Sequence, residues 1–589
     1  MSNTQAYMIP TSRKEIDALG WDFVDIIFFS GDAFIDHPSF GTAVLARFLQ
    51  AAGYRVAVVP QPNWRDDLRD FKKLGRPRLF FGVNSGVMDS MVNHYTANKR
   101  LRSDDAYTPD GRAGQRPDYA VTVYSKILKQ LYPDVPLVIG GIEASLRRFT
   151  HYDYWSDRLR PSILVESGAD YLSYGMGERT LLALAQAYDR GEGLGKIRSI
   201  PQLAWLESGS HYGTNLKETE KQIELNSYER CLADAKSFAE NFHYIEREAN
   251  RKVALRLIER VGDRALVVNP PYLPETPQEM DRYYDLPYTK EPHPRYRGKH
   301  IPAYEMIKFS INTHRGCFGG CNFCTIAAHQ GKFIRCRTAA SIVGEVKKLT
   351  QNPNFKGIVS DIGGPTANMY GLHGKNTQLC DRCVRKSCLF PNRCENLMTS
   401  HQTLLSLYKE LEGVRGLKRF FIGSGIRYDL FLDERGFLDE TSEPYLKALI
   451  LKHTSGRLKV APEHTEDNVL KYMAKPSFAL FVRLRQAFDR IIAQAGVHYQ
   501  LVPYFISSHP GCQLEDMQRL SANPALKGLY MDQVQDFMPT PMTASSVMFY
   551  TGLDLKTGRA LFVERNQDRK RNQKSFFLKK SVRDRKNTL

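Results

Sequence analysis

The stretch RGCFGGCNFC, residues 315–324, gathers three of the chain's ten cysteines on one glycine-rich loop. The spacing is C-x3-C-x2-C, with thiols at Cys317, Cys321 and Cys324. Three thiols do not form a two-cysteine redox pair. No charged, apolar leader opens the chain, so we expect a cytoplasmic protein whose thiols stay reduced rather than forming disulfides. Metal binding is the remaining reason to gather three thiolates so closely.

Two kinds of metal site fit this loop. A structural zinc site needs four ligands, and His314 or His329 could supply the fourth. A 4Fe–4S cluster can instead be held by three thiolates, which leaves one iron open, although ferredoxins use four cysteines at other spacings. An open iron can chelate S-adenosylmethionine, and one electron then breaks a carbon–sulfur bond to give a 5′-deoxyadenosyl radical. The cofactor supplies that chemistry, and the protein supplies its placement.

A second group of thiols follows in CDRCVRKSCLFPNRC, at C-x2-C-x4-C-x5-C. Its members are Cys380, Cys383, Cys388 and Cys394. Four soft ligands suit zinc and an iron–sulfur cluster alike. Zinc would hold together a small insertion that has no core of its own, whereas a second cluster would relay electrons or touch substrate, and we favour the cluster. Three further cysteines stand alone, which is typical of small buried hydrophobic residues: Cys231, Cys336 and Cys512.

Hydrophobic periodicity predicts the elements that carry these loops. Strand-like runs at 23–32, 55–62, 78–86 and 136–141 alternate with helical patterns at 41–54, 120–132 and 169–188. This alternation predicts an α/β domain over residues 1–205, with a doubly wound parallel sheet whose glycine-rich strand ends suit a binding crevice. Residues 206–304 look like a charged helical connector followed by an extended linker rich in Pro and Tyr.

Residues 305–550 again alternate strand and helix patterns, with six strand-like runs. Six units are too few for a closed eight-stranded barrel, so we predict a partial (βα)6 barrel with its site at the carboxyl ends of the strands. The three-cysteine loop follows the first run, and the cysteine-rich insertion, 366–398, falls between the second and third. The basic segment 551–589 is expected to be a solvated tail or a terminal helix.

Overall composition sets the broad class of the protein. The chain has 589 residues and 42% hydrophobic residues, which fits several globular domains. No apolar run approaches the roughly 20 residues that span a bilayer, so no membrane is expected as a partner. With 82 Lys and Arg against 64 Asp and Glu, the formal charge is +18. That balance could serve RNA binding or simply solubility.

The three-cysteine loop, with the aromatic Phe323 before its last cysteine, resembles the loop of the radical S-adenosylmethionine superfamily. The phrases GGIEASLRRFTHYDYWSD, SDIGGPTANMYG and QDFMPTPMTASSVMFYTG resemble the YgiQ family within it, over most of the chain. The resemblance implies a 4Fe–4S cluster on the three cysteines, S-adenosylmethionine as cofactor, and a reductant such as flavodoxin or ferredoxin.

The resemblance leaves the substrate unassigned. A macromolecule or a cofactor precursor, modified by methylation, thiolation or rearrangement, fits such an enzyme, and RNA is one candidate. The alternative is a redox or nucleic-acid-binding iron–sulfur protein without radical turnover.

The superfamily pattern also implies contacts to S-adenosylmethionine. Members carry a Gly-Gly-Glu-Pro-like turn after the second barrel strand, and here Gly363, Gly364 and Pro365 stand without the acidic residue. The backbone carbonyls of the two glycines could still accept hydrogen bonds from the methionine amino group. Phe323 would cover the cluster and lean against adenine. After the third strand, Ser424 or Arg427 would meet the ribose or the methionine carboxylate, which arginine binds well.

After the fourth strand, the phrase APEHTED offers Glu463 and His464 as further cofactor contacts. The same phrase also fits an ordinary helix start in which Thr465 is the N-cap. Both interpretations stay open on the sequence.

The N-terminal domain resembles cobalamin-binding domains in its rhythm of strands and helices. Such domains can ligate cobalt through an Asp-x-His-x-x-Gly loop, but Asp36 and His37 are adjacent here. We therefore do not expect cobalamin to bind. We do expect the N-terminal domain to close over the barrel, with Arg147, His151 or Tyr154 near the cavity above the cysteine loop, because a radical must be shielded from water.

Overall fold

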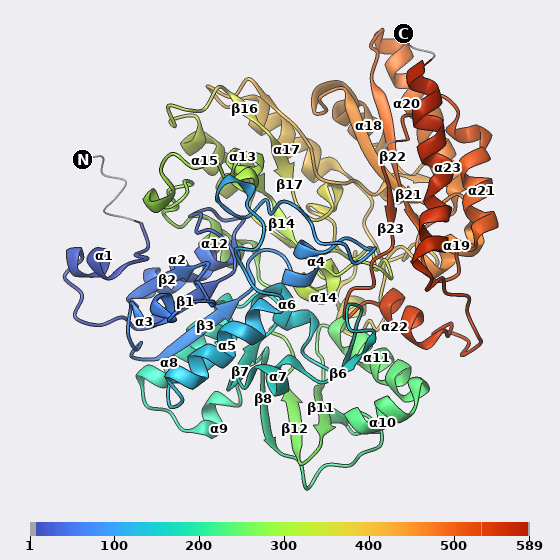
Figure 1. The fold of residues 1–589 in the computed structure, drawn as a ribbon. Coiled ribbons are helices and arrows are strands. Elements are labelled where there is room, and N and C mark those ends of the chain that lie inside the picture. Colours follow the sequence, from blue (N-terminus) through green and yellow to red (C-terminus); the bar gives the residue numbers. More distant parts are fainter. Residues whose placement is uncertain (1–7, 532, 587–589) are drawn as a thin grey trace.

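The computed structural model describes residues 8–531 and 533–586. Figure 1 shows the N-terminal part of the chain in blue to green and the C-terminal part, yellow to red, packed above and beside it. In the described ranges, no helix is both long and apolar enough to cross a membrane.

The N-terminal part is built on one large mixed sheet. Five of its strands are parallel and adjacent in the order β2 (Val56–Pro60), β1 (Ile26–Ser30), β3 (Phe80–Asn84), β4 (Leu137–Ile139) and β7 (Tyr171–Ser173). Every residue of β1, β2 and β3 is buried, because helices cover both faces. The helices α2 (Gly41–Ala51) and α8 (Glu178–Asp189) pack on one face, and α5 (Ala120–Leu131) on the other.

The sheet does not end at residue 205. It continues through β8 (Leu203–Ser208), β12 (Arg264–Val268), β11 (Arg256–Val261), β10 (Gln222–Glu224) and β9 (Lys217–Glu218). The prediction of a helical connector over 206–262 is therefore wrong for these strands and right for α10 (Tyr228–Ala233) and α11 (Ala235–Ala249). A Gly-Asp pair between β11 and β12 was the hairpin signal in the sequence. Charged residues within the strands had suggested a solvated helix instead.

The expected linker, 269–304, also holds regular structure. It contains α12 (Pro277–Tyr284) and the start of α13 (Pro302–Ile307). Tyr283 and Tyr284 of α12 are buried against α2, so this segment is tied to the N-terminal part.

All six strands expected in the C-terminal part are present. They are β13 (Ser310–Asn312), the interrupted pair β16 (Ile358–Val359) and β17 (Asp361–Gly363), β18 (Arg419–Phe420), β21 (Arg457–Glu463), β22 (Gln500–Ser507) and β23 (Gln533–Asp536). All pairings among them are parallel, in three groups: β13 with β17, β16 with β18, and β21 with β22 and β23. One continuous barrel sheet is thus not formed among the described strands.

Helices cover these strands and bury one large apolar core with them. The helices are α15 (Ala339–Leu349), α17 (Gln402–Glu412), α18 (Ser442–Lys452) and α20 (Phe478–Ala495). The alternation of strand and helix that the sequence predicted is therefore present, and the carboxyl ends of β13, β17 and β21 point toward the cysteine loop.

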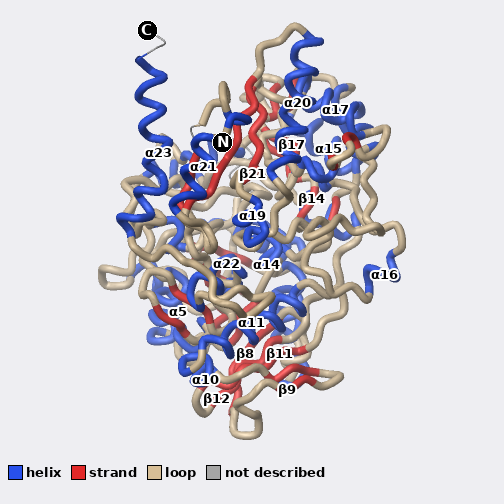
Figure 2. The backbone as a smooth tube through the Cα atoms, turned by 90° about the vertical axis from the view of Figure 1, so that its right-hand side faces the viewer, coloured by secondary structure: helices blue, strands red, loops and turns tan. Residues whose placement is uncertain are grey.

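The basic C-terminal segment is a helix, α23 (Gln567–Lys586), one of the two forms expected for it. It packs against α21 (Leu514–Ala522). The Gln573 side chain accepts a hydrogen bond from the Ser508 amide at 2.9 Å, so the first half of the helix belongs to the folded body. Figure 2 shows its far end extending past the rest of the chain.

Candidate functional site

The cysteine loop, residues 315–324, runs from β14 (His314–Arg315) to α14 (Ile326–Gln330). Gly316 and Gly320 have φ of +91° and +63°, a region that disfavours any other residue. A Cβ at Gly316 would lie 2.3 Å from the Phe333 carbonyl oxygen, and one at Gly320 would lie 2.6 Å from Cβ of Ser387. The glycines therefore allow both the tight turns and the close approach of the neighbouring chain segments.

Residues distant in the sequence hold this loop through Asn322. Its side-chain amide donates to the Tyr472 carbonyl at 2.8 Å, and its backbone N–H donates to the Met473 carbonyl at 3.0 Å. The Ser545 amide in turn donates to the Asn322 carbonyl at 2.9 Å. The path between the second and third cysteines is thus set by α19 (Asp467–Met473) and α22 (Ala544–Thr551).

The three thiols of the loop lie within electrostatic reach of one another. Burial raises the pKa of Cys324 to about 12, and negative charge on Cys321 and Cys317 raises it further. Burial also raises the pKa of Cys317, whose Sγ lies 3.5 Å from the hydroxyl of Thr366. Burial therefore favours the neutral form of Cys317 and Cys324 until a metal displaces their protons, as metal binding by cysteine requires.

Arg427 places a positive charge directly beside the loop. Its Nη1 donates to Cys321 Sγ at 3.1 Å, and its Nε donates to Asp429 at 2.9 Å. The backbone N–H of Arg427 donates to Asn368 Oδ1 at 2.9 Å, so the residue is held from both ends. The sequence suggested a contact with a methionine carboxylate; in this structure the guanidinium is shared between a thiol and a carboxylate.

The glycine–glycine–proline turn meets the cysteine loop at the end of β17. The Thr313 amide donates to the Gly363 carbonyl at 2.7 Å, which ties the turn to the strand that precedes the loop. A Cβ on Gly364 would lie 2.5 Å from the imidazole of His314. Pro365 is followed by Thr366, the residue in contact with Cys317. The turn and the three cysteines, predicted separately, are therefore brought together.

Ser424 points its hydroxyl at a carboxylate. Its Oγ donates to Asp361 Oδ2 at 2.5 Å, and the Gly423 amide donates to Oδ1 at 2.8 Å. Asp361, the first residue of β17, therefore fixes the loop after β18 to this strand. We gave Asp361 no role from the sequence, although an acidic residue that precedes a glycine turn at a strand end was the available signal.

Glu463 ends β21 with a φ of +70°, which is strained for a residue with a side chain. Its carboxylate is buried and lies 3.5 Å from Nζ of Lys475. Burial raises the pKa of Glu463, and the Lys475 charge opposes that shift. Negative charge on Glu463 also raises the pKa of Cys324, so this carboxylate faces the cysteine loop.

The neighbouring residues have structural roles. The His464 Nδ1 accepts a hydrogen bond from the Glu466 amide at 3.1 Å, and its Nε2 lies 3.7 Å from Sγ of buried Cys512. The residue before α19 is Glu466, and the Thr465 hydroxyl donates to its carboxylate at 3.0 Å. The prediction of Thr465 as the N-cap is therefore wrong.

Phe323 packs against a cluster of aromatic residues that come from both the N-terminal and the C-terminal parts of the chain. Its ring packs edge-on against His509, with centroids 6.3 Å apart, and it contacts a buried cluster that contains Tyr154. Arg147 instead forms a buried ion pair with Asp89 inside the N-terminal part. The segment after α6 (Gly141–Leu146) thus faces the C-terminal part through its aromatic residues and not through Arg147.

The cysteine-rich insertion is seated on the cysteine loop. The Cys388 amide donates to the Phe318 carbonyl at 3.0 Å, and the Ser387 hydroxyl donates to the Gly319 carbonyl at 2.8 Å. Cys317, Cys388 and Cys394 line one apolar cluster around Phe318.

The four insertion thiols interact with one another and with a lysine. Burial raises the pKa of Cys388 to about 11, the charge of Lys332 lowers it, and the other three thiols raise it. Nζ of Lys332 lies 3.5 Å from Cys383 Sγ, and Nδ2 of Asn396 lies 3.4 Å from Cys380 Sγ.

In the part of the chain that the structure describes, no three His, Cys, Asp or Glu side chains are placed as ligands of one metal ion. His314, one candidate for a fourth zinc ligand, bonds to the Thr313 hydroxyl at 2.8 Å, and the other, His329, lines a cleft toward the N-terminal sheet. The three-thiol loop, with its glycine turns and the Arg427 cation, has the donor set that a 4Fe–4S cluster needs.

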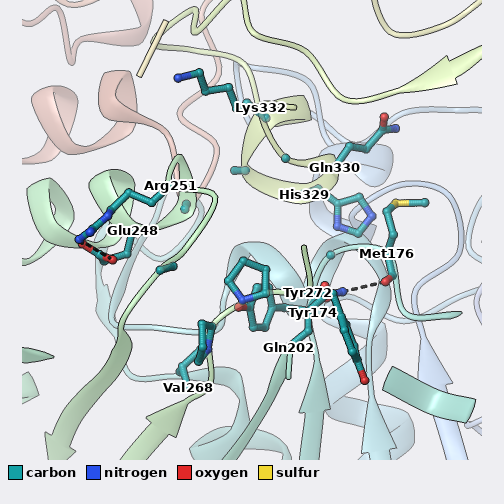
Figure 3. Close-up of a pocket in the computed structure, with 18 of the residues that line it drawn as sticks. Tyr174, Met176, Gln202, Glu248, Arg251, Val268, Tyr272, His329, Gln330 and Lys332 are labelled. Atoms are coloured by element: carbon teal, nitrogen blue, oxygen red, sulfur yellow. Dashed lines mark hydrogen bonds and ion pairs between the residues drawn. The ribbon is translucent and has the colours of Figure 1, made fainter. Parts of the chain in front are cut away.

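That cleft lies between α14 and the carboxyl end of β7. Figure 3 shows His329 and Gln330 of α14 above it, with Tyr174, Gln202 and Tyr272 below. It has a cavity volume of about 100 Å³ and adjoins a second hollow, lined by Asn84, Ser173 and Glu178, that shares His329. Strand ends of this kind are where parallel sheets bind ligands.

Comparison with known proteins identifies the family. The chain matches the description Radical SAM N-terminal over residues 8–310, and a domain of unknown function (DUF3362) over 532–586. A UPF0313 protein of Bacteroides thetaiotaomicron is 52% identical, with 99% of this chain and 95% of the relative aligned. The chain belongs to the UPF0313 family. Another member, UPF0313 protein YgiQ of Escherichia coli, is 42% identical over 93% of this chain and 80% of its own. The resemblance to the YgiQ family and to radical S-adenosylmethionine proteins is thereby confirmed.

Two groups of solved structures are similar to this UPF0313 chain at low identity. The methyltransferase TsrM from Kitasatospora setae, with cobalamin and a 4Fe–4S cluster bound, is 15% identical with a TM-score of 0.47, over 90% of this chain and 74% of its own. The cobalamin-dependent radical enzyme OxsB, with aqua-cobalamin bound, is 12% identical with a TM-score of 0.45, over 92% and 56%.

These structures contradict our expectation that cobalamin does not bind. That expectation rested on Asp36 and His37, and both have structural roles in this protein. Asp36 forms a buried ion pair with Arg47, and His37 Nδ1 accepts the Ser39 amide at 3.1 Å. The spacing of these two residues therefore carries no information about cobalamin, and the expectation is withdrawn.

Proposed function

We propose that this UPF0313 protein is a radical enzyme that holds a 4Fe–4S cluster on Cys317, Cys321 and Cys324 and cleaves S-adenosylmethionine reductively. When bound, the cluster supplies the electron that breaks the carbon–sulfur bond. The observation that supports the proposal is the contact between two separate motifs. Thr366, which follows the Gly363–Gly364–Pro365 turn, lies 3.5 Å from Cys317 Sγ. A cluster kept only for structure needs no such turn beside it.

The surrounding residues have defined parts in this proposal. The second lone pair of the Gly363 carbonyl and the carbonyl of Gly364 would accept hydrogen bonds from the cofactor amino group. Arg427 donates a hydrogen bond to Cys321 Sγ and would offset part of the negative charge of the cluster ligands. Glu463 and Lys475 present a buried, hydrogen-bonded pair at the end of β21. Phe323, packed against His509, excludes water from the far side of the loop.

A second metal centre on the insertion completes the proposal. The thiols of Cys380, Cys383, Cys388 and Cys394 would supply its four sulfur ligands, and Cys388 is hydrogen-bonded to the loop through Phe318. We assign this centre to electron relay: a cluster held there would supply electron transfer between a flavodoxin- or ferredoxin-like carrier and the three-cysteine site. Lys332, beside Cys383, compensates the negative charge of four thiolates.

Anaerobic reconstitution tests the function directly. With dithionite and S-adenosylmethionine, the wild-type chain is expected to release 5′-deoxyadenosine. The Cys317→Ala/Cys321→Ala/Cys324→Ala variant is expected to release none and to keep only the iron of the insertion. Cleavage by the triple variant would refute the site. An intact cluster with no cleavage in the wild type would favour the redox or nucleic-acid-binding alternative.

A variant with all four insertion cysteines changed to Ala separates the two centres. It is expected to retain cleavage with dithionite and to lose it with a protein reductant, together with part of the iron and sulfide. Zinc in place of iron in the wild-type insertion would exclude the relay.

A further inference from the structure

The cleft beside α14 contains an arginine without a counter-ion. Arg148 is 3% exposed and lines the cleft with Tyr174, Asn269 and His329. Its Nη1 donates to the Ser145 carbonyl at 2.7 Å, while its Nε is fully buried and has no partner. Among the described residues, no carboxylate lies within ion-pair distance of this guanidinium.

The preceding residue shows what an arginine with a counter-ion looks like here. Arg147 is also buried, and its guanidinium forms an ion pair with Asp89, although its Nε, like that of Arg148, has no partner. Two other arginines of the cleft are paired as well: Arg335 lies 2.8 Å from Glu275, and Arg251 lies 3.2 Å from Glu248. Figure 3 shows the latter pair at the edge of the cleft. Among the described residues, Arg148 is therefore the arginine that lines the cleft without a carboxylate partner. Lys332 also lacks one, but its Nζ donates to the Arg385 carbonyl and lies beside Cys383.

An unpaired buried charge is costly, so its retention needs a reason. The stack of Arg148 on Tyr174, 4.8 Å from the ring centroid, fixes the guanidinium plane without neutralising it. Positive potential extends across the cleft, because the charges of Arg148, Arg315 and Arg335 all act on His329. The Nδ1 of His329 is itself buried without a partner.

We propose that this cleft binds an oxyanion group, a phosphate or carboxylate of a small molecule, through Arg148. Arginine pairs with such groups in a bidentate manner. The rest of the ligand would lie on the apolar wall that Tyr174, Tyr272 and Pro270 provide. The cleft has a cavity volume of about 100 Å³ and opens to solvent, so it has room for a small molecule. Since α14 follows directly on Cys324, the ligand would end close to the cysteine loop.

The assignment of the anion to the substrate rests on the proposed radical function. The binding of an anion to the cleft does not depend on that function. Binding is therefore measured without turnover, on the full anaerobically prepared chain. Phenyl phosphate and benzoate present the two oxyanions on the same aromatic body, and benzyl alcohol is the neutral comparison. Thermal shift and isothermal titration are expected to show binding of at least one anion and none of benzyl alcohol.

Arg148→Met keeps an apolar stem against Tyr174 and removes the charge. It is expected to weaken anion binding by about tenfold or more, the loss for a charge-assisted hydrogen bond. Without ligand its melting temperature should equal or exceed that of the wild type, because an uncompensated charge is gone. Arg147→Met, the matched control, should melt lower because it strands Asp89, and should still bind the anion.

Three results would overturn the proposal. The first is that neither anion binds the wild type, and the second is that Arg148→Met binds an anion as tightly as the wild type. The third is that Arg148→Met melts as low as Arg147→Met, which would make Arg148 a structural residue. If binding is established and 5′-deoxyadenosine is never formed, the cleft stands and the radical function fails.

Discussion

Glu259→Gln is the substitution for which the structure gives the clearest energetic expectation. Glu259 lies in β11 and is fully buried. Its Oε2 accepts the Thr150 amide at 2.9 Å, and its Oε1 has no partner among the described residues. Burial raises the pKa of Glu259 from 4.5 to about 7. Thr150 lies two residues after Arg148, so Glu259 anchors the segment that lines the cleft.

The raised pKa fixes the direction of the effect. The unfolded chain binds a proton at Glu259 only below about pH 4.5, whereas the folded chain keeps it up to about pH 7. The stability that protonation contributes is therefore complete below the unfolded pKa and is lost as pH rises through 7. Since a tenfold difference in proton affinity is worth about 1.4 kcal/mol, the loss by pH 8 is about 3 kcal/mol.

Glutamine retains an oxygen that can accept from Thr150 and never carries the charge. Glu259→Gln should therefore match the wild type near pH 5 and exceed it near pH 8 by up to about 3 kcal/mol. A chain of this size does not unfold in two states, so amide hydrogen exchange of β11 and β12 is the assay of choice. Equal exchange at both pH values, or the same pH dependence in the variant, would refute the reasoning.

Two further substitutions test the candidate site. Gly364→Ala puts a Cβ 2.5 Å from the His314 ring, and it should weaken S-adenosylmethionine binding in equilibrium dialysis without loss of iron. Gly425→Ala is the control, because a Cβ at that position meets nothing within 4 Å. Equal effects of the two substitutions would contradict the geometry. Arg427→Met removes the ion-pair partner of the Asp429 carboxylate. It should lower the local stability that amide hydrogen exchange measures around Asp429 by about 3 kcal/mol, with Asp429→Leu restoring most of it. A single variant as stable as the wild type would disprove that pairing.

Local features of the site could be predicted because they depend on spacing along the chain. The three-cysteine loop, the glycine turn at 363–365 and the strand ends that carry them all follow from residue types and periodicity. The richness of the loop in glycine was visible in the sequence, and Gly316 and Gly320 have the positive φ values that glycine permits.

Partners from distant segments could not be predicted. Arg147 and Arg148 are adjacent and chemically identical, and nothing local shows that only the first meets an aspartate at position 89. The contact of Ser387 with the cysteine loop joins residues 68 positions apart in sequence. The strands at 256–268 were missed because their charged residues match a solvated helix as well as a sheet edge.

The anchoring of Asn322 has a consequence for biosynthesis. Three of its backbone and side-chain partners lie at Tyr472, Met473 and Ser545, so the path of the loop between Cys321 and Cys324 is fixed only after residue 545 of 589 has been translated. A nascent chain still on the ribosome presents three reduced thiols on an unfinished loop. Cluster delivery to this loop is accordingly expected after release, to a nearly complete protein. C-terminal truncations between Cys512 and Ser545 should accumulate without the iron of the three-cysteine site even though every cysteine is present.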